Sequence, residues 1–353
     1  MYYKFEYNSY SQNYTLYLAN NQVDSTYLYF NGSWATGGST NCAAIIKMGT
    51  GNVLLPENCS GLFRNFRITS VPSGLDFSQV KDASYMFAQC YELEYAYISS
   101  WNWSTNVTDM SNMFTGCQKL TYIDASGWEV SKVTNFSNMF SMTGTIPTTA
   151  TQTIKCDNWD TSSATDMSEM FRLCKNLESV SGIDNFKMDN VTNLRYFFYS
   201  CKKLGNIDCR NWNVSKCTNF ANAFDSCESF TSLNLKNWEV NKNQKVSFLY
   251  MFSGCNNLTN IYVGRDVDWR EYSNESDRMF DGCTKLPNYN SSSTDATKAY
   301  PDEWGGGYLT FFTEWLTGTW YIKDSEGNWL ESDLYCWRNS EGTYEEETTY
   351  FKC

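Results

Sequence analysis

A phenylalanine recurs through the middle of the chain at a nearly constant interval, and this repeat restricts the fold more than any other feature. Successive members are 27, 26, 31, 27, 26, 28 and 28 residues apart. The series is Phe87, Phe114, Phe140, Phe171, Phe198, Phe224, Phe252 and Phe280. Self-similarity at a period of about 20 to 50 residues is typical of repeat arrays, in which each unit buries its apolar face against its neighbours. We therefore expect one elongated array to dominate the 353 residues.

Each unit divides into two halves within the consensus V-T-x-M-S-x-M-F-x-x-C-x-x-L-x-x-I-x-x-x-x-W. In NVTDMSNMFTGC, the apolar residues from Val107 to Cys117 fall at i, i+3, i+6, i+7 and i+10, which predicts a short helix. In LTYIDA, Leu120, Ile123 and Ala125 match the strand segment of a leucine-rich repeat. The predicted fold is an α/β leucine-rich-repeat solenoid, with short helices and a parallel ladder of strands about 4.8 Å apart.

The flanks of the array lack the repeat and predict three further segments. Residues 1–55 contain aromatic runs such as YYKFEYN and YTLYLA between polar turns, which predicts a small β module. The solenoid is expected over residues 56–290, beginning with a degenerate unit in which Phe63 takes the place of the repeated phenylalanine. A polar, Gly-rich linker is predicted at 291–307 and a second, aromatic β module at 308–353.

The cysteines follow the repeat, so they are not read as a disulfide framework. Of the 14, seven occupy the M-F-x-x-C position and three more align with other small apolar positions of the unit. Packed helices of neighbouring units would hold these side chains farther apart than a disulfide allows. We expect buried free thiols there, and leave open whether Cys336 and Cys353 form a pair.

Composition and motifs exclude several functional classes. The chain has no His, a formal net charge of −12 and no cluster of Lys and Arg, which argues against histidine-based catalysis and against nucleic-acid binding. It contains no run of about 20 apolar residues, so no membrane span is expected. A Gly-rich phosphate loop, paired C-x-x-C motifs and an acidic calcium loop are all missing from the sequence. We expect no enzyme activity, no catalytic residues, no metal and no cofactor.

The repeat units resemble a known family. The runs NVTDMSNMFTGCQKLTYIDASGWEVSKVTNFSNMF and SSATDMSEMFRLCKNLESVSGIDNF are similar to BspA-like leucine-rich-repeat surface proteins. Their M-F-x-x-C-x-x-L units also occur in mycoplasma lipoproteins. The resemblance covers residues 58–290 and implies a solenoid used for adhesion or recognition of a host surface, with no catalytic residues to transfer.

The outward positions of the predicted strands are the candidate ligand-binding surface, because the residues between them point into the core. They are rich in Tyr, Asn, Ser and Asp, a composition suited to a glycan or a polar protein epitope. Exposed strands must be polar in any case, so a solvated face without a ligand is the alternative. The candidates are Tyr95, Tyr97, Tyr122, Asp124, Asn206, Asp208, Asn234, Asn260 and Tyr262.

Two further features are candidate binding sites. An aromatic residue follows each strand at constant phase, which favours a core ladder over a stack of exposed sugar-binding rings. The column is Trp101, Trp128, Trp159, Phe186, Trp212 and Trp238. The interval of 31 residues includes the Thr-rich segment SMTGTIPTTATQT, which predicts a surface loop. Such an insertion is either tolerated without a role or carries binding.

Together these features predict a non-enzymatic recognition protein. The start of the chain lacks the pattern of a signal peptide, which favours folding in a host cytoplasm and a bacteriophage virion component, such as a tail or fibre protein. The expected partners are a host cell-surface glycan or protein, other virion proteins and further copies of the chain. A secreted or cell-surface bacterial adhesin and a structural decoration protein without ligand are the alternatives.

Overall fold

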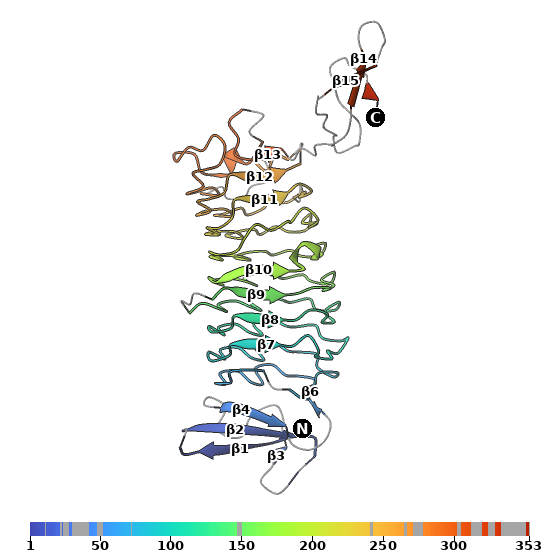
Figure 1. Cartoon of the computed structure of the whole chain (residues 1–353), viewed down its shortest axis with the longest axis vertical. Helices are drawn as coiled ribbons and strands as arrows, with labels where there is room; N and C mark the ends of the chain where they lie inside the picture. The colour runs from blue at the N-terminus through green and yellow to red at the C-terminus, as the bar shows by residue number, and fades with distance from the viewer. Residues whose placement is uncertain are drawn as a thin grey trace.

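The protein is an elongated solenoid of stacked turns with a β-sheet at its N-terminal end (Figure 1). The computed structural model describes residues 1–10, 12–21, 23, 28–29, 42–47, 52–71, 73–146, 150–240, 243–264, 267–270, 278–301, 305–311, 320–323, 329–332 and 351–352. This architecture confirms the predicted repeat solenoid. Among these residues, no helix is long and apolar enough to span a membrane.

Parallel strands form one side of the solenoid, as predicted. The first pair is β5 (Val53–Leu54) with β6 (Leu75–Asp76). The next sheet contains β7 (Tyr95–Tyr97), β8 (Tyr122–Asp124), β9 (Gln152–Lys155) and β10 (Leu177–Ser181). A further sheet contains β11 (Ser232–Leu235), β12 (Asn260–Val263) and β13 (Thr310–Phe311). Every pairing within these sheets is parallel.

The other half of each unit is a ladder of β-turns, so the predicted helix is wrong. Backbone N–H groups of Met110, Asn112, Phe114 and Gly116 donate to carbonyls of the next unit at 2.8–3.1 Å. The intervening N–H groups close turns within the unit, as from Cys117 to the Phe114 carbonyl at 3.1 Å. Helical structure in the described residues is confined to the 3-10 turns η2 (Ile183–Asn185) and η3 (Ala296–Lys298).

The spacing of the solenoid explains why turns replace a helix. Neighbouring turns are joined by backbone hydrogen bonds on both sides, which requires a separation of about 4.8 Å. An α-helix with its side chains is about 10 Å wide and keeps its N–H groups for itself. The apolar pattern is still satisfied, because the five apolar residues from Val107 to Cys117 are all buried. The sequence periodicity therefore identified the buried face but not the backbone that presents it.

Left-handed residues make these turns repeat. In every unit from Phe63 to Phe280, the residues two before and two after the phenylalanine have φ between 52° and 76°. Most are not glycine; Tyr196 and Leu173 are examples. A non-glycine residue in this region costs on the order of 1 kcal/mol. The hydrogen bonds between turns offset that cost.

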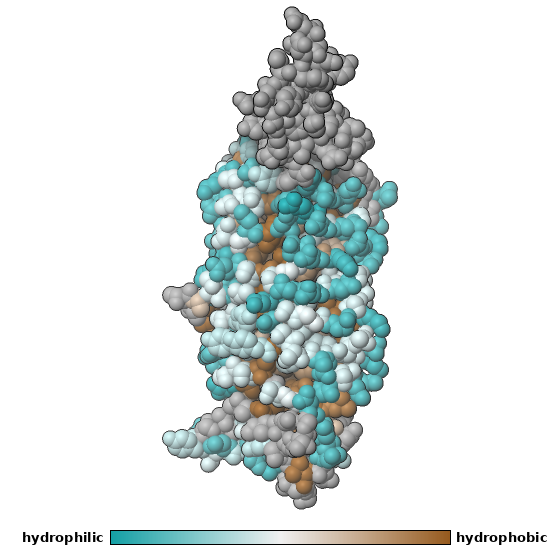
Figure 2. Space-filling model, turned by 45° about the vertical axis from the view of Figure 1, so that its right-hand side comes forward, coloured by the Kyte–Doolittle hydropathy of each residue, from teal (hydrophilic) through white to brown (hydrophobic). Residues whose placement is uncertain are grey.

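Two columns of aromatic rings fill the interior. The phenylalanines from Phe63 to Phe280 stack on one another with ring centroids 5.1–6.2 Å apart. The second column contains Trp128, whose ring lies 6.1 Å from that of Trp159, and both are buried. Indole Nε1 of Trp128 donates to the Ile98 carbonyl of the preceding turn at 2.7 Å. The column is core from Trp128 onward, as predicted, whereas Trp101 at its start is half-buried. Hydrophobic residues reach the surface in Figure 2 mainly as narrow strips between hydrophilic ones.

The repeated cysteines form a third column. The twelve cysteines in the described part of the chain are free and buried, which confirms the prediction for the ten cysteines of the repeat. Cys336 and Cys353 lie outside the described residues. Each thiol at the M-F-x-x-C position donates to the carbonyl of the phenylalanine one unit earlier; the Cys201 Sγ lies 3.0 Å from the Phe171 oxygen. Thr143 takes this place in the unit of 31 residues. Burial raises the pKa of Cys174 to about 12, so the thiol stays protonated.

A mixed sheet covers the N-terminal end of the solenoid. Its strands are β1 (Tyr2–Asn8), β2 (Asn13–Ala19), β3 (Leu28–Tyr29) and β4 (Cys42–Lys47), in the order β3-β1-β2-β4. The Phe5 ring packs edge-on against Phe66 at 6.4 Å, and the Arg67 N–H donates to the Cys42 carbonyl at 2.7 Å. The sheet thus joins the core of the first unit and covers its apolar end.

The segment predicted as a linker, 291–307, contains residues that pack on the last turn. The Phe280 N–H donates to the Thr294 carbonyl at 2.8 Å, and Ala296 and Ala299 are buried. Tyr308 packs edge-on against Phe280 and ends the phenylalanine column. Strand β13 then pairs in parallel with β12, so the solenoid sheet extends to Phe311. This segment packs on the last turn because the apolar side chains at that end of the solenoid would otherwise be exposed to water.

A small antiparallel sheet lies near the C-terminus. It contains β14 (Trp320–Lys323), β15 (Trp329–Ser332) and β16 (Phe351–Lys352), with β14 in the centre. These strands fall within the β module predicted for the end of the chain.

The left-handed backbone at Gly116 predicts that an alanine at this position destabilises the protein. Gly116 has φ +76°, and a Cβ there would lie 3.4 Å from Gln89 Cγ. Gly116→Ala should destabilise the protein by about 1–2 kcal/mol and lower the midpoint of urea unfolding. Gly205→Ala is the control, because its φ lies outside the left-handed region and its nearest neighbour would be 3.8 Å away. Equal midpoints for the two variants would contradict the assigned turn geometry.

Candidate functional site

The candidate ligand-binding residues of the first units lie in register on neighbouring strands. Tyr95 pairs with Tyr122, and Tyr97 pairs with Asp124. In the next strand, Lys155 takes the position beside Asp124. The residues between them are buried, so the paired side chains project outward from a rigid backbone.

Three tyrosines form an aromatic patch on this strand face. Tyr95 and Tyr97 are 46% and 68% exposed, large fractions for aromatic side chains. Their ring centroids are 6.4 Å apart and stacked, and the Tyr122 ring lies 5.2 Å from that of Tyr97. We call Tyr95, Tyr97 and Tyr122 the tyrosine patch. It offers continuous aromatic surface with three hydroxyl groups.

Charged groups border the tyrosine patch on one side. The Lys155 Nζ lies 5.6 Å from the centroid of the Tyr122 ring, a cation–π contact. The pKa of Lys155 is raised, first by its hydrogen bond with the Tyr122 hydroxyl and then by nearby negative charge, including Asp124. The Asp124 carboxylate accepts from the Ser126 hydroxyl at 2.6 Å. Lys155 therefore remains a cation and a hydrogen-bond donor at neutral pH.

Farther along the solenoid, the candidate residues hold the backbone together. The regular sheet is interrupted between β10 and β11, and Asn206 bridges the interruption. Its Oδ1 accepts from the N–H groups of Thr231 and Ser232 at 2.8 and 3.1 Å. Its Nδ2 donates to the Thr231 hydroxyl at 2.9 Å. The Asn206 amide is thus committed to the fold.

Asp208 and Asn234 also serve the turns. The Asp208 carboxylate accepts from the backbone and side chain of Arg210, which lowers its pKa against the opposing effect of burial. The Asn234 Oδ1 accepts from the Lys236 N–H at 3.2 Å. The Asp208 carboxylate and the Asn234 amide oxygen are thus used in contacts within the chain, and they are less available to a ligand than the tyrosine patch.

The last two candidates lie on β12, between β11 and β13. Tyr262 pairs with Thr310, and the Thr310 hydroxyl lies 3.4 Å from Asn260 Oδ1. Both candidates are half-buried. The nine candidate residues therefore do not form one uniform surface, and the exposed aromatic area is concentrated on β7 and β8.

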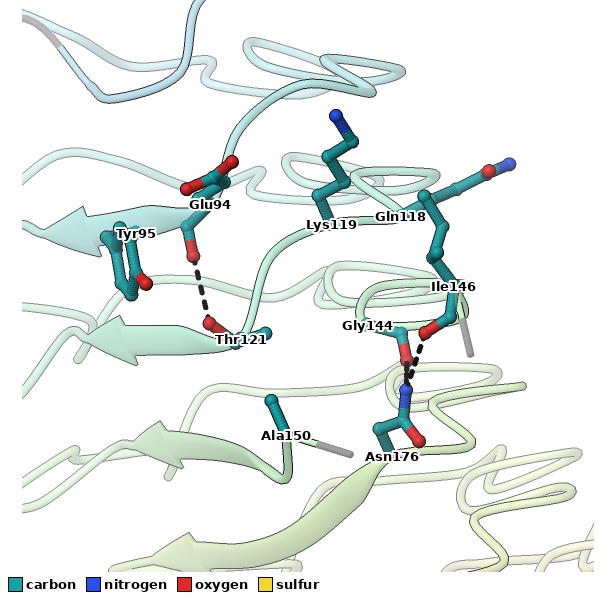
Figure 3. Close-up of a pocket in the computed structure, with 9 residues that line it drawn as sticks. All are labelled: Glu94, Tyr95, Gln118, Lys119, Thr121, Gly144, Ile146, Ala150 and Asn176. Atoms are coloured by element: carbon teal, nitrogen blue, oxygen red, sulfur yellow. Dashed lines mark hydrogen bonds between the residues drawn. The ribbon is translucent and has the colours of Figure 1, made fainter. Parts of the chain in front are cut away.

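A pocket of about 350 Å³ opens beside the tyrosine patch (Figure 3). It lies between the starts of β7 and β8 on one side and Gly144, Ile146 and Ala150 of the longest unit on the other. The residues that line it are Glu94, Tyr95, Gln118, Lys119, Thr121, Gly144, Ile146, Ala150 and Asn176. Sequence reasoning marked only Tyr95 of this set. For the other lining residues, the sequence offered one indication, the interval of 31 residues that marks the insertion.

The described residues hold no cluster of three or more His, Cys, Asp or Glu side chains that could bind a metal ion. The free thiols are buried and their pKa values are raised by burial where a shift is resolved, as for Cys255 at about 12. The chemistry offered by the strand face is that of aromatic contact and hydrogen bonding.

The hydrogen bonds of Asn206 to the next unit predict that removing its amide destabilises the protein. Asn206→Ala should leave two backbone N–H groups without their acceptor and lower the free energy of unfolding by about 1–2 kcal/mol. The measurement is urea unfolding followed by tryptophan fluorescence. Asn237→Ala, at an exposed position of the neighbouring unit, is the control and should change stability by less than about 0.5 kcal/mol. If Asn206→Ala were as stable as the control, the hydrogen bonds of Asn206 would not contribute to the stability of the fold.

Comparison with known proteins identifies the family of the array. A family model described as "Mycoplasma protein of unknown function, DUF285" matches residues 57–152 and 141–265. No curated protein matches the sequence. The two matched segments overlap within the solenoid and together cover more than half of the 353 residues. The chain therefore belongs to the DUF285 family.

Proposed function

We propose that the protein is a non-enzymatic recognition protein that binds a glycan of a cell surface through the strand face of its solenoid. The tyrosine patch is the main contact. The observation that carries the proposal is the exposure of Tyr95 and Tyr97 at the two outward positions of strand β7.

Exposure of these rings is not needed for folding. The core is already filled by the two aromatic columns and the inward strand residues. Tyr95 and Tyr97 are largely exposed, so they add little to the packing of the core. Aromatic rings held by a β-ladder offer a large contact area and lose little conformational entropy on binding. Tyrosine hydroxyls, Lys155 and Asp124 supply donors and acceptors of the kind that sugar hydroxyl groups pair with.

The resemblance of the repeats to BspA-like surface proteins supports a role in surface recognition. The same face would serve a bacteriophage tail or fibre protein that contacts its host, or a bacterial adhesin at the cell surface. Further virion proteins, or more copies of the chain, would then attach through one of the β-sheets at the ends. A decoration protein without a ligand is the competing account, and it predicts that the tyrosine patch has no partner.

Loss of the patch should weaken recognition while the protein stays folded. The double substitution Tyr97→Ala and Tyr122→Ala should weaken glycan binding at least about 10-fold, because truncating a tyrosine at the centre of an interface commonly costs about 1 kcal/mol or more. Binding would be measured on an array of bacterial and host glycans and then by calorimetry on the glycan that binds. Circular dichroism and thermal unfolding would establish that the fold is retained.

Tyr10→Ala is the matched control. This tyrosine is 99% exposed but lies in the turn between β1 and β2, away from the strand face. It should bind as the unaltered protein does. Equal binding by the double variant would refute the strand face as the recognition surface, and no binding to any glycan would favour the decoration protein.

A further inference from the structure

The pocket in Figure 3 is continuous with the tyrosine patch, since Tyr95 belongs to both. The strand face by itself is open, whereas the pocket has walls on two sides. A ligand lying on the tyrosine patch therefore has a neighbouring recess into which a substituent fits. The volume of about 350 Å³ is at the small end of the range of ligand pockets, about 300–1,000 Å³.

The wall opposite the strands is fixed by buried amides. The Asn176 Nδ2 donates to the carbonyls of Gly144 and Ile146 at 2.7 and 2.9 Å, as Figure 3 shows. The Gln152 Nε2 donates to the Leu120 carbonyl and to the Thr143 hydroxyl at 2.7 and 2.9 Å. Both amide side chains are buried. The start of the insertion is thus tied to the solenoid and does not merely lie over it.

Close packing also shapes this wall. Gly144 has φ +56°, and a Cβ there would lie 2.9 Å from the Cδ of Gln152. Only glycine lets the chain turn at this point against the buried amide. The turn brings Ile146 to the far side of the pocket from the strands.

The inner surface is largely apolar. Ile146 and Ala150 contribute aliphatic groups. Thr121 donates its hydroxyl to the Glu94 carbonyl at 3.3 Å, so its methyl group is what remains for the pocket. Polar groups lie at the rim, among them the Gln118 amide and the Glu94 carboxylate.

The charged groups near the rim neutralise one another. Lys119 forms an ion pair with Glu92, and the pKa of Glu92 is lowered, chiefly by its hydrogen bond with Lys119. Arg67 also approaches Glu92, at 4.0 Å. Two cations thus lie near two carboxylates, those of Glu92 and Glu94, and these four charges sum to zero. The ligand group that fits best is neutral, with an apolar end for the inner surface of the pocket and an amide or hydroxyl end for the polar rim.

We propose that this pocket is a subsite for the acetamido group of an N-acetylhexosamine in the bound glycan. The inference rests on the proposed function. The sugar ring lies against Tyr95 and Tyr97, the acetamido methyl enters the pocket beside Thr121 and Ile146, and the amide faces the polar rim. A sugar with a hydroxyl in place of the acetamido group leaves the apolar walls without a partner, and its hydroxyl meets them without a hydrogen bond.

The experiment compares sugars that differ only in this group. The probes are matched oligosaccharide pairs, N-acetylated and hydroxylated at C2, in both the glucose and the galactose series. The full-length protein should bind the N-acetylated member at least about 10-fold more tightly in the series that it recognises, the discrimination that one or two buried apolar carbons typically give. Equal affinity within every pair overturns the subsite.

Variants separate the subsite from the strand face. Ile146→Phe fills the pocket and should remove the preference for the N-acetylated member while binding of the hydroxylated member remains. Val23→Phe, at a position 53% exposed near the N-terminus, is the control and should keep the preference. Gln118→Ala tests the rim without adding bulk and should reduce the preference if Ile146→Phe does not fold.

The two hypotheses fail in different ways. Tyr97→Ala should weaken binding of both members of a pair and leave their ratio unchanged. If Tyr97→Ala has no effect on either member, the proposed function is wrong. If Tyr97→Ala weakens both but Ile146→Phe and Gln118→Ala leave the ratio intact, the strand face binds glycan and the acetamido subsite is wrong.

Discussion

The structure depends on backbone hydrogen bonds between successive turns, which hold equivalent residues of neighbouring units one above the other. Everything inside the solenoid follows from this vertical alignment. Phenylalanines stack with ring centroids 5.1–6.2 Å apart, and each cysteine thiol reaches the phenylalanine carbonyl one unit earlier. Because any chemical group in the repeat meets its own copy, each position must tolerate contact with itself. Aromatic rings, thiols and amides meet that condition, which accounts for the composition of the core.

The same alignment limits what the surface can do. On the strand face, outward side chains of consecutive units are neighbours, so a run of tyrosines becomes a continuous aromatic patch. Where the alignment is interrupted, as at Asn206, side-chain amides restore the missing backbone contacts and are lost to binding. The longest unit breaks the repeat in another way, since its residues Gly144, Ile146 and Ala150 line a pocket beside β7 and β8. Recognition is expected at the place where exposed aromatic rings and this irregular unit meet.

The sequence was sufficient for the solenoid, its parallel strands and its buried columns, because these depend on which positions are apolar. It was misleading about the backbone of the M-F half. A period of three and four residues fits an α-helix, and it fits equally a chain of four-residue turns with left-handed residues such as Asn112 and Gly116. Nothing local distinguishes the two, since residues at these positions range from glycine to tyrosine and leucine. The choice is made by the spacing between turns, which is a property of the whole array.

The candidate site was predicted in part, for a related reason. Outward strand positions follow from alternation, so all nine candidates were placed on the strand side of their units. Alternation does not reveal that the Asn206 amide is used by the fold, because its partners lie about one unit away in the chain. The pocket was missed because it joins residues as distant as Glu94 and Asn176 through the irregular insertion. Its only trace in the sequence was the longer interval.

Far-UV circular dichroism of the purified protein is the most direct test of the central claim that each unit pairs a strand with a ladder of turns. The turn ladder predicts a spectrum of strand and turn, without the paired minima of α-helix. A helical contribution equivalent to one short helix in each unit would contradict it and would restore the conventional leucine-rich-repeat architecture.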